Sequence, residues 1–168
     1  MPNKKILITG ATGFIGQQLL SYLNLSKKVS SGDVSTIKII SRNIQPIYET
    51  IVCDLQCENI PDNIMDDVDT VFHLAGYTHD VKSLGNKEDY FKLNVQATKN
   101  LAKVATHCGV SSFIYLSSTK AGPNNDFQSS EKKAEGMYGE TKRAAEIAIL
   151  DVASSSDMRI NIIRPALI

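Results

Sequence analysis

Six short apolar segments alternate with longer amphipathic segments along the chain. The apolar segments are rich in isoleucine, valine and threonine and cover residues 4–9, 36–41, 49–54, 69–74, 112–117 and 159–164. Uninterrupted apolar runs of this length are typical of strands that are buried on both faces of a parallel sheet. The pattern therefore predicts six buried strands.

The segments between several of these strands have helical periodicity. We expect helices that start at Phe14, Tyr90 and Tyr138 and cover residues 14–23, 90–108 and 138–154. Strands that alternate with helices predict an α/β fold, a Rossmann-like doubly wound parallel sheet of about six strands with helices on both faces. The 168 residues, of which 42% are hydrophobic, fit one domain over residues 1–168.

Three polar segments interrupt this pattern. Residues 27–35 are expected to form a loop before the second strand, and residues 124–136 a mobile lid on the ligand side of the sheet. The acidic cluster at residues 62–69 has the charges of a metal site but no fixed ligand spacing. We interpret it as a solvated loop or short helix.

The distribution of charge excludes some classes of partner. The 18 basic and 18 acidic residues give a formal net charge of zero and are spread along the chain, which gives no electrostatic reason to expect nucleic acid or an anionic membrane as partner. The first 16 residues contain only a short apolar run that threonine and glycine interrupt. They resemble neither a signal peptide nor a membrane span.

Potential metal ligands are few and have no shared spacing. They are Cys53, Cys57, Cys108, His73, His79 and His107. A zinc site would need a second cysteine pair beside Cys53 and Cys57. We therefore expect free thiols in a reducing cytoplasm, histidines with structural or loop roles, and no metal.

The first predicted strand runs directly into the glycine-rich segment ITGATGFIG at residues 8–16. Gly10 would allow a tight turn off the strand, Gly13 the close approach of a pyrophosphate, and Gly16 the packing of the helix against the strand. Phosphate would then bind at a helix N-terminus, where free amides and the helix dipole favour negative charge. The segment predicts dinucleotide binding; the alternative is a glycine-rich turn without a ligand.

The residues after the second predicted strand bear on the choice of cofactor. An acidic side chain there would bind the ribose 2′-hydroxyl of NAD, whereas a cation would accept the 2′-phosphate of NADP. Ser41 and Arg42 occupy this place, which favours NADP(H) modestly over NAD(H). An arginine can also stack on adenine with either cofactor.

Tyr138 and Lys142 are four residues apart at the start of a predicted helix, so their side chains share one face. A free tyrosine, with a pKa of about 10, is a poor base at neutral pH, but a nearby ammonium favours its phenolate form. The pair is therefore a candidate for proton transfer. The same spacing also occurs by chance on ordinary helix surfaces.

The glycine spacing differs by one residue from the dehydrogenase fingerprint, and TGATGFIG resembles the extended branch of the short-chain dehydrogenase/reductase family, the nucleoside-diphosphate-sugar epimerases, dehydratases and reductases. Further resemblances follow in order: CDL at 53–55, HLAG at 73–76, NVQATKNL at 94–101, FIYLSS at 113–118, YGETK at 138–142 and RP at 164–165. They cover nearly all of this chain but about the first half of a typical member. The resemblance thus implies a dinucleotide-binding Rossmann domain, truncated relative to the family, without the C-terminal substrate-binding portion.

The resemblance implies a role for each matching residue. The implied cofactor-binding residues are Gly10, Thr12, Gly13, Phe14, Ile15, Gly16, Ser41, Arg42, Asp54, Leu55, Ala75, Gly76 and Lys142. The implied catalytic residues are Ser118, Tyr138, Lys142 and Asn94. In the family, the serine binds the substrate oxygen, the tyrosine is the base, the lysine lowers its pKa and binds the ribose, and the asparagine holds active-site backbone and water.

Some of these positions have a simpler interpretation. Asp54 and Leu55 would contact adenine, with the Asp54 carboxylate accepting from the amino group, but Asp54 could instead cap a strand end. Ala75 and Gly76 would line the nicotinamide ribose and the pyrophosphate. Asn94 could be an ordinary polar residue of a helix whose hydrogen bonds are satisfied.

Thr119 and Lys120 stand where the sugar 4,6-dehydratases of the family have an acidic pair, which argues against dehydration. The resemblance then implies NAD(P)-dependent epimerisation of a nucleotide sugar, with a UDP-sugar as the expected substrate, or reduction of a keto-sugar. The alternatives are a non-catalytic dinucleotide-binding module and an atypical reductase of a non-sugar carbonyl. In the family the helices that start here near Tyr90 and Tyr138 form a dimer contact, so a homodimer is a further expectation.

Overall fold

The computed structural model describes residues 5–29, 36–56, 60–77, 87–122 and 134–166. Its centre is a six-stranded sheet in the order β3-β2-β1-β4-β5-β6, in which every pair of neighbours is parallel. The strands are β1 (Lys5–Thr9), β2 (Thr36–Ser41), β3 (Glu49–Val52), β4 (Val68–His73), β5 (Ser112–Leu116) and β6 (Arg159–Ile163). All six predicted strands are therefore confirmed, with ends that shift by at most two residues.

The strand order reverses at β1, which pairs with β2 on one side and β4 on the other. Ile8 lies beside Ile39 of β2 and Phe72 of β4. In open α/β sheets, ligands bind at the carboxyl ends of the strands at such a reversal. The topology thus directs attention to the segments that follow β1 and β4.

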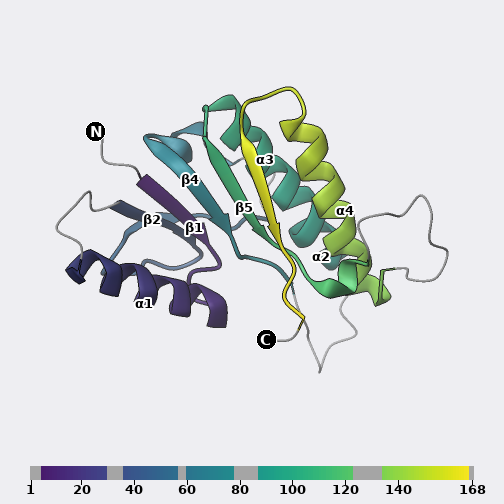
Figure 1. Ribbon diagram of the computed structural model, residues 1–168, viewed down its shortest axis with the longest axis horizontal. Helices are drawn as coiled ribbons and strands as arrows, with labels where there is room; N and C mark the ends of the chain where they lie inside the picture. The colour runs from purple at the N-terminus through teal and green to yellow at the C-terminus, as the bar shows by residue number, and fades with distance from the viewer. Residues whose placement is uncertain (1–4, 30–35, 57–59, 78–86, 123–133, 167–168) are drawn as a thin grey trace.

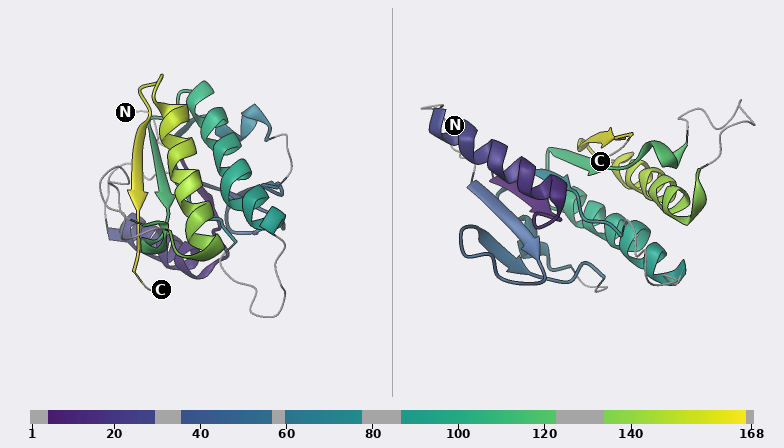
Figure 2. Two further views of the ribbon diagram at one scale, coloured as in Figure 1. Left: turned by 90° about the vertical axis from the view of Figure 1, so that its right-hand side faces the viewer. Right: turned by 90° about the horizontal axis from the view of Figure 1, so that it is seen from below.

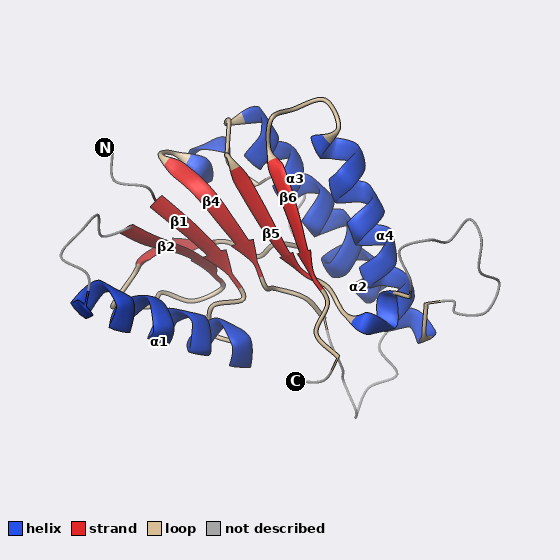
Figure 3. Cartoon of the chain, viewed as in Figure 1, coloured by secondary structure: helices blue, strands red, loops and turns tan. Residues whose placement is uncertain are grey.

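Helices cover both faces of the sheet, as the sequence predicts (Figures 1 and 3). The helix α1 (Phe14–Val29) lies on one face, and α2 (Lys87–Phe91), the π-helix η2 (Lys92–Ala97), α3 (Thr98–His107) and α4 (Gly136–Ala153) lie on the other. Figure 2 shows the two helical layers from the side and from below.

Two clusters of buried apolar side chains hold the layers together. Ile8 and Ile39 belong to the cluster under α1, whereas Leu7, Val71 and Phe113 belong to the larger cluster under α3 and α4. Neighbouring residues of β1 therefore supply opposite cores, since successive side chains of a strand point to opposite faces.

The helix α1 continues to Val29, so the expected loop at 27–35 was wrong over residues 27–29. Lysine is a good helix former, and the first glycine or proline after Gly16 is Gly32. Residues 30–35 lie outside the described part of the chain.

The predicted helix at 90–108 begins earlier, at Lys87, and is interrupted by the π turn of η2. A π turn accommodates one extra residue and is frequent at functional sites. Asn94 lies in its middle and is buried, so the irregularity coincides with a predicted site residue.

The acidic cluster at 62–69 forms the short 3-10 helix η1 (Asp62–Met65), followed by a turn and the start of β4. Lys38 of β2, which is buried, donates to the carbonyls of Ile64 and Asp66 and so ties this segment to the sheet. Within the described residues no group of three or more acidic, histidine or cysteine side chains could hold a metal ion. The expectation of a short helix is confirmed.

Two further points concern the limits of the described chain. Most of the expected lid at 124–136 lies outside the described residues. Among the helices that are described, none combines the length and the apolar character that crossing a membrane requires.

Candidate active site

The turn after β1 is built on the close approach of backbone segments at two glycines. Gly10 has a φ of 69°, and a Cβ atom there would lie 2.6 Å from the backbone nitrogen of Ala75. A Cβ atom at Gly16 would lie 2.2 Å from the carbonyl oxygen of Gly10. The chain therefore has the tight turn at Gly10 and the close helix packing at Gly16 that the sequence predicts.

The same turn presents the N-terminus of α1. The Gly13 N–H donates to the Gly10 carbonyl at 3.0 Å, and the helix begins at the next residue, Phe14. The first amides of a helix have no acceptor within the helix and carry the positive end of its dipole. Gly13, Phe14, Ile15 and Gly16 line a cavity of about 470 Å³, so this end of the cavity favours an anionic group.

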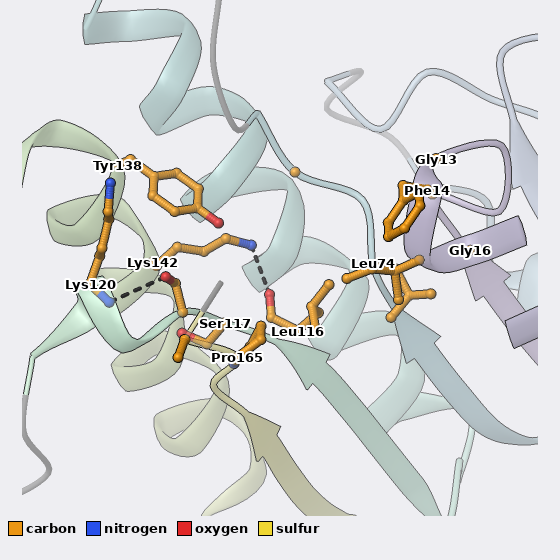
Figure 4. Close-up of a pocket in the computed structure, with 15 residues that line it drawn as sticks. Gly13, Phe14, Gly16, Leu74, Leu116, Ser117, Lys120, Tyr138, Lys142 and Pro165 are labelled. Carbon is orange, nitrogen blue, oxygen red and sulfur yellow. Dashed lines mark hydrogen bonds between the residues drawn. The ribbon is translucent and has the colours of Figure 1, made fainter. Parts of the chain in front are cut away.

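The cavity runs from the glycine turn to the carboxyl ends of β5 and β6 (Figure 4). Ser118, Tyr138 and Lys142 line its far end, and Gly76 and Pro165 contribute to its walls. Tyr138 and Lys142 come from the first two turns of α4, whereas Ser118 follows β5. The fold thus brings the three predicted reactive residues together, although Ser118 and Tyr138 are 20 residues apart in sequence.

Ser118 is held by the segment that follows it. Its hydroxyl, in a residue that is only 8% exposed, accepts from the backbone N–H of Lys120 at 3.2 Å. This bond caps the 3-10 helix η3 (Thr119–Ala121). Thr119 and Lys120, which stand in place of the dehydratase acids, are therefore part of η3, and Lys120 also lines the cavity.

Lys142 carries an ammonium group in buried surroundings. Its Nζ donates to the Leu116 carbonyl at 2.8 Å and lies 4.8 Å from the ring centroid of Tyr115 and 5.9 Å from that of Tyr138. Burial lowers the pKa of Lys142 from 10.5 to about 8, and the Glu146 carboxylate acts in the opposite direction.

Tyr138 does not have the lowered pKa that the sequence analysis expects. Burial raises the pKa of its phenol, a hydrogen bond with Ser118 lowers it, and Tyr90 raises it further. The net shift is upward because desolvation by burial is the largest contribution. In this arrangement Tyr138 is a phenol at neutral pH.

Asn94 fixes the backbone beside the cavity. Its Oδ1 accepts from the Tyr77 N–H at 2.7 Å, and its Nδ2 donates to the Tyr77 carbonyl and to the Thr141 hydroxyl, each at 3.1 Å. A Cβ atom on Gly76 would lie 3.0 Å from Lys142 Nζ and 3.3 Å from Asn94 Oδ1. Asn94 therefore holds backbone, as the resemblance implies, and joins it to α4 one residue before Lys142.

The residues predicted to contact adenine and its ribose lie at the end of β2 or just after β2 and β3. They are not among the residues that line the cavity. Ser41 and Asp54 are close through the backbone, since the Cys53 N–H donates to the Ser41 carbonyl at 3.1 Å. Arg42 and Asp54 are exposed, whereas Leu55 is 7% exposed and packs in the larger core. An adenine contact at Leu55 would therefore come mainly from its backbone.

Two other predicted cofactor residues belong to the turns around Gly10. Thr12 is exposed, and its carbonyl accepts from the Gln17 side chain at 2.9 Å. The Ala75 N–H donates to the Thr9 hydroxyl at 3.2 Å, which ties the end of β4 to the end of β1.

The histidines and cysteines in the described residues have no arrangement typical of a reactive site. His73 lies between the hydroxyls of Thr9 and Thr98, at 2.7 and 2.8 Å, and burial lowers its pKa to about 3, with a smaller contribution from Lys142. It is a neutral structural residue. His107 and Cys108 are exposed, and neither Cys53 nor Cys108 is in a disulfide bond. His79 and Cys57 lie outside the described residues.

Comparison with known proteins agrees with this geometry. The NAD dependent epimerase/dehydratase family matches residues 6–168. The chain belongs to this family.

Individual relatives of the epimerase/dehydratase family cover nearly all of the chain. UDP-glucose 4-epimerase of Vibrio cholerae is 30% identical over 98% of this chain and 52% of its own length. A 3-beta-hydroxysteroid dehydrogenase of Mycolicibacterium neoaurum is 27% identical over 96% of this chain and 47% of its own length. Among solved structures, MoeE5 in complex with UDP-glucose and NAD has a TM-score of 0.76 and 28% identity, and the match covers 95% of this chain and 53% of MoeE5. The chain thus spans about half the length of the curated relatives it matches.

The sequence analysis missed four residues that shape this epimerase/dehydratase site. Tyr77 and Thr141 bind Asn94, and the buried Glu146 forms an ion pair with the partly buried Arg164 behind the cavity. Thr141 and Arg164 had a signal, as parts of the YGETK and RP motifs. The others act through contacts that the tertiary packing creates.

We predict that Lys142 titrates near pH 8, well below the ordinary lysine pKa of 10.5. Nitrogen-15 NMR of the lysine side chains should detect one such transition, which is lost in Lys142→Met. Because the unfolded chain binds more protons between pH 8 and 10.5, this group's contribution to stability should rise with pH across that window. Titration of every lysine near 10.5 would contradict the prediction.

Proposed function

We propose that this chain is the cofactor-binding portion of an NAD(P)-dependent nucleotide-sugar epimerase or keto-sugar reductase. The observation that carries the proposal is the meeting of Ser118, Tyr138 and Lys142 at one end of a cavity whose other end is the N-terminus of α1. One end suits a pyrophosphate and the other suits proton transfer to a carbinol or carbonyl oxygen.

The described residues fit a nicotinamide dinucleotide. Gly10, Gly13 and Gly16 line the cavity without side chains, and the missing side chain at Gly76 leaves room for Lys142 Nζ beside the segment after β4. Gly10, Gly13 and Gly16 would hold the pyrophosphate, and Lys142 would bind the ribose hydroxyls. When bound, the cofactor supplies the acceptor and donor of hydride.

The protein's own residues supply the proton chemistry. The Ser118 hydroxyl binds the substrate oxygen and stabilises charge that develops on it. Tyr138, whose pKa is raised, is protonated at neutral pH and donates its proton to a carbonyl oxygen in the reducing direction. Donation leaves a phenolate, which the positive charge of Lys142 stabilises. In the oxidising direction this phenolate accepts the carbinol proton and becomes the phenol again.

A UDP-sugar is the proposed substrate. Supporting this are the UDP-glucose 4-epimerase relative and the UDP-glucose in the MoeE5 structure. The charged groups that line the described cavity, Lys120 and Lys142, are both cationic, which favours a diphosphate-bearing ligand.

A second candidate is the reduction or oxidation of a non-sugar substrate. The steroid dehydrogenase relative, at 27% identity over 96% of the chain, favours it. A panel of UDP-sugars and steroid alcohols, assayed by the change in NAD(P)H absorbance or by product analysis, separates the two. A non-catalytic module would bind cofactor and convert no member of the panel.

We predict that Tyr138→Phe abolishes turnover, by about a hundredfold or more, because it removes the proton-transferring hydroxyl. Cofactor affinity should stay within about twofold. The assay uses UDP-glucose and the protein that contains this chain, and cofactor binding is followed by NADH fluorescence.

Tyr22→Phe is the matched control, since Tyr22 is 68% exposed on α1 and should change neither quantity. Retained turnover in Tyr138→Phe would remove Tyr138 from the mechanism. Failure of the unaltered protein to bind either NADH or NADPH would overturn the proposed function as a whole.

We predict tighter binding of NADP(H) than of NAD(H), because Ser41 ends β2 and Arg42 follows it, where an acidic side chain would select NAD. Titration of both cofactors measures the ratio. Arg42→Gln should reduce NADP affinity about tenfold and NAD affinity much less, since a charge-assisted bond to phosphate is lost. Tighter NAD binding in the unaltered protein would refute the preference.

We also propose a homodimer through the two long helices that start near Tyr90 and Tyr138, which are the continuous run of α2, η2 and α3, and α4. Phe91, Ile147 and Leu150 are each more than half exposed on these helices, and such a set of apolar side chains supports a protein interface. Leu150→Lys should produce monomers in sedimentation equilibrium, whereas Tyr22→Lys on α1 should leave dimers intact. A monomeric unaltered chain at micromolar concentration would contradict the proposal.

A further inference from the structure

One face of α4 carries three functional groups at helical spacing. Tyr138, Lys142 and Glu146 are successive i, i+4 positions and therefore lie one above another along the helix. The first two line the cavity. Glu146 lies one turn further from it and is 1% exposed, so a full carboxylate is buried directly behind the proposed active site.

The partner of Glu146 comes from the end of β6. Arg164 donates from Nε to Glu146 Oε1 at 2.7 Å and from its second terminal nitrogen to Oε2. The two planar groups thus meet through two parallel bonds, the geometry that is strongest for an arginine and a carboxylate. Arg143, within α4, also contacts Oε2, at 3.3 Å.

Arg164 has a third bond that leads to the serine segment. Its remaining terminal nitrogen donates to the Gly122 carbonyl at 2.6 Å. Gly122 has a φ of 83° and ends η3, the short helix that Ser118 caps. A single guanidinium therefore bonds α4 at Glu146 and the Ser118–Gly122 segment at its far end.

Backbone bonds connect the same segments more closely to the cavity. The Ser117 N–H donates to the Ile163 carbonyl at 2.7 Å, and the Thr119 N–H to the Pro165 carbonyl at 3.2 Å. Pro165 directly follows Arg164 and lines the cavity. The guanidinium thus lies where three cavity-forming segments converge: α4, the end of β5 with η3, and the end of β6.

A buried ion pair is a poor means of gaining stability alone, since desolvation of both charges offsets most of their attraction. It is, however, strict in geometry. Arg164 can bond Glu146 and the Gly122 carbonyl at the same time only in one relative placement of α4 and η3. The pair therefore restricts how far α4 can slide or rotate against η3. That relation determines the distance between the Ser118 and Tyr138 hydroxyls.

We propose that Glu146 and Arg164, together with the Gly122 carbonyl, form a clamp that aligns Ser118 with Tyr138 and Lys142. The two side chains are positioning residues, because they contact the segments that carry the reactive groups and not the cavity's reacting end. The clamp rests on the proposed function for its meaning, and its geometry rests on the hydrogen bonds described above. A misalignment of about 1 Å is enough to impair a site of this kind severely.

Arg164→Lys is the principal test. Lysine keeps the charge and one bond to Glu146, but its single ammonium cannot reproduce the two bonds to the carboxylate and the bond to Gly122. NADH affinity should fall about tenfold, because Lys142 and the β5 end are no longer held in register. Hydrogen exchange should accelerate at the amides of Thr119, Ala121 and Gly122 and remain unchanged in β1 and β2.

Arg143→Gln is the matched control. It removes another cation from the same Glu146 oxygen, but that contact stays within α4, so NADH affinity and exchange in η3 should match the unaltered chain. Glu146→Gln, which preserves volume, should resemble Arg164→Lys and replaces it if that variant does not fold.

Three outcomes would overturn the clamp. One is uniform acceleration of exchange with unchanged NADH affinity, which describes a purely stabilising pair. Another is an equal effect of Arg143→Gln. The third is loss of folding at 20 °C in both Arg164→Lys and Glu146→Gln, which would assign the pair to folding. If the unaltered chain binds neither NADH nor NADPH, the proposed function fails, while accelerated exchange confined to η3 would still support the clamp.

Discussion

The backbone contact at Gly10 is the constraint on which the carboxyl edge of the sheet depends. Gly10 brings the turn after β1 against Ala75, at the end of β4, and against Gly16 in the first turn of α1. No side chain fits between these segments. As a result, the dipole end of α1 and the end of β4 occupy adjoining walls of one cavity, and the reversal of strand order becomes a binding site.

The opposite end of the cavity depends on a balance of charge in buried surroundings. Lys142 has its ammonium among a carbonyl and two aromatic rings, and Glu146 is the carboxylate that acts on it. Burial and, to a smaller extent, the same cation lower the pKa of His73, so its ring is neutral at pH 7. The Tyr138 ring thus lies beside one buried ammonium group. In the proposed mechanism, the phenol transfers the proton and the ammonium provides electrostatic support.

The sequence predicted those features that local chemistry determines. Strands buried on both faces must be apolar throughout, and the turn at Gly10 tolerates no side chain, so both can be recognised from residue type. The pairing of Glu146 with Arg164, 18 residues away, depends on how α4 packs on β6. The raised pKa of Tyr138 likewise follows from burial, which spacing along a helix does not report. The family resemblance identified Asn94 as a site residue but gave no role to Tyr77 and Thr141, which bind it.

The π turn at residues 92–97 has a consequence for how this helix can vary. A π turn is equivalent to one residue inserted into an α-helix, and it separates two requirements that a regular helix would couple. Leu101 and Ala105 face the core, while Asn94 faces Tyr77. A deletion of one residue here would leave a continuous helix, but it would rotate the side chain of Asn94 by about 100° relative to the core-facing side chains. Changes of helix length in related chains should therefore be found outside this turn.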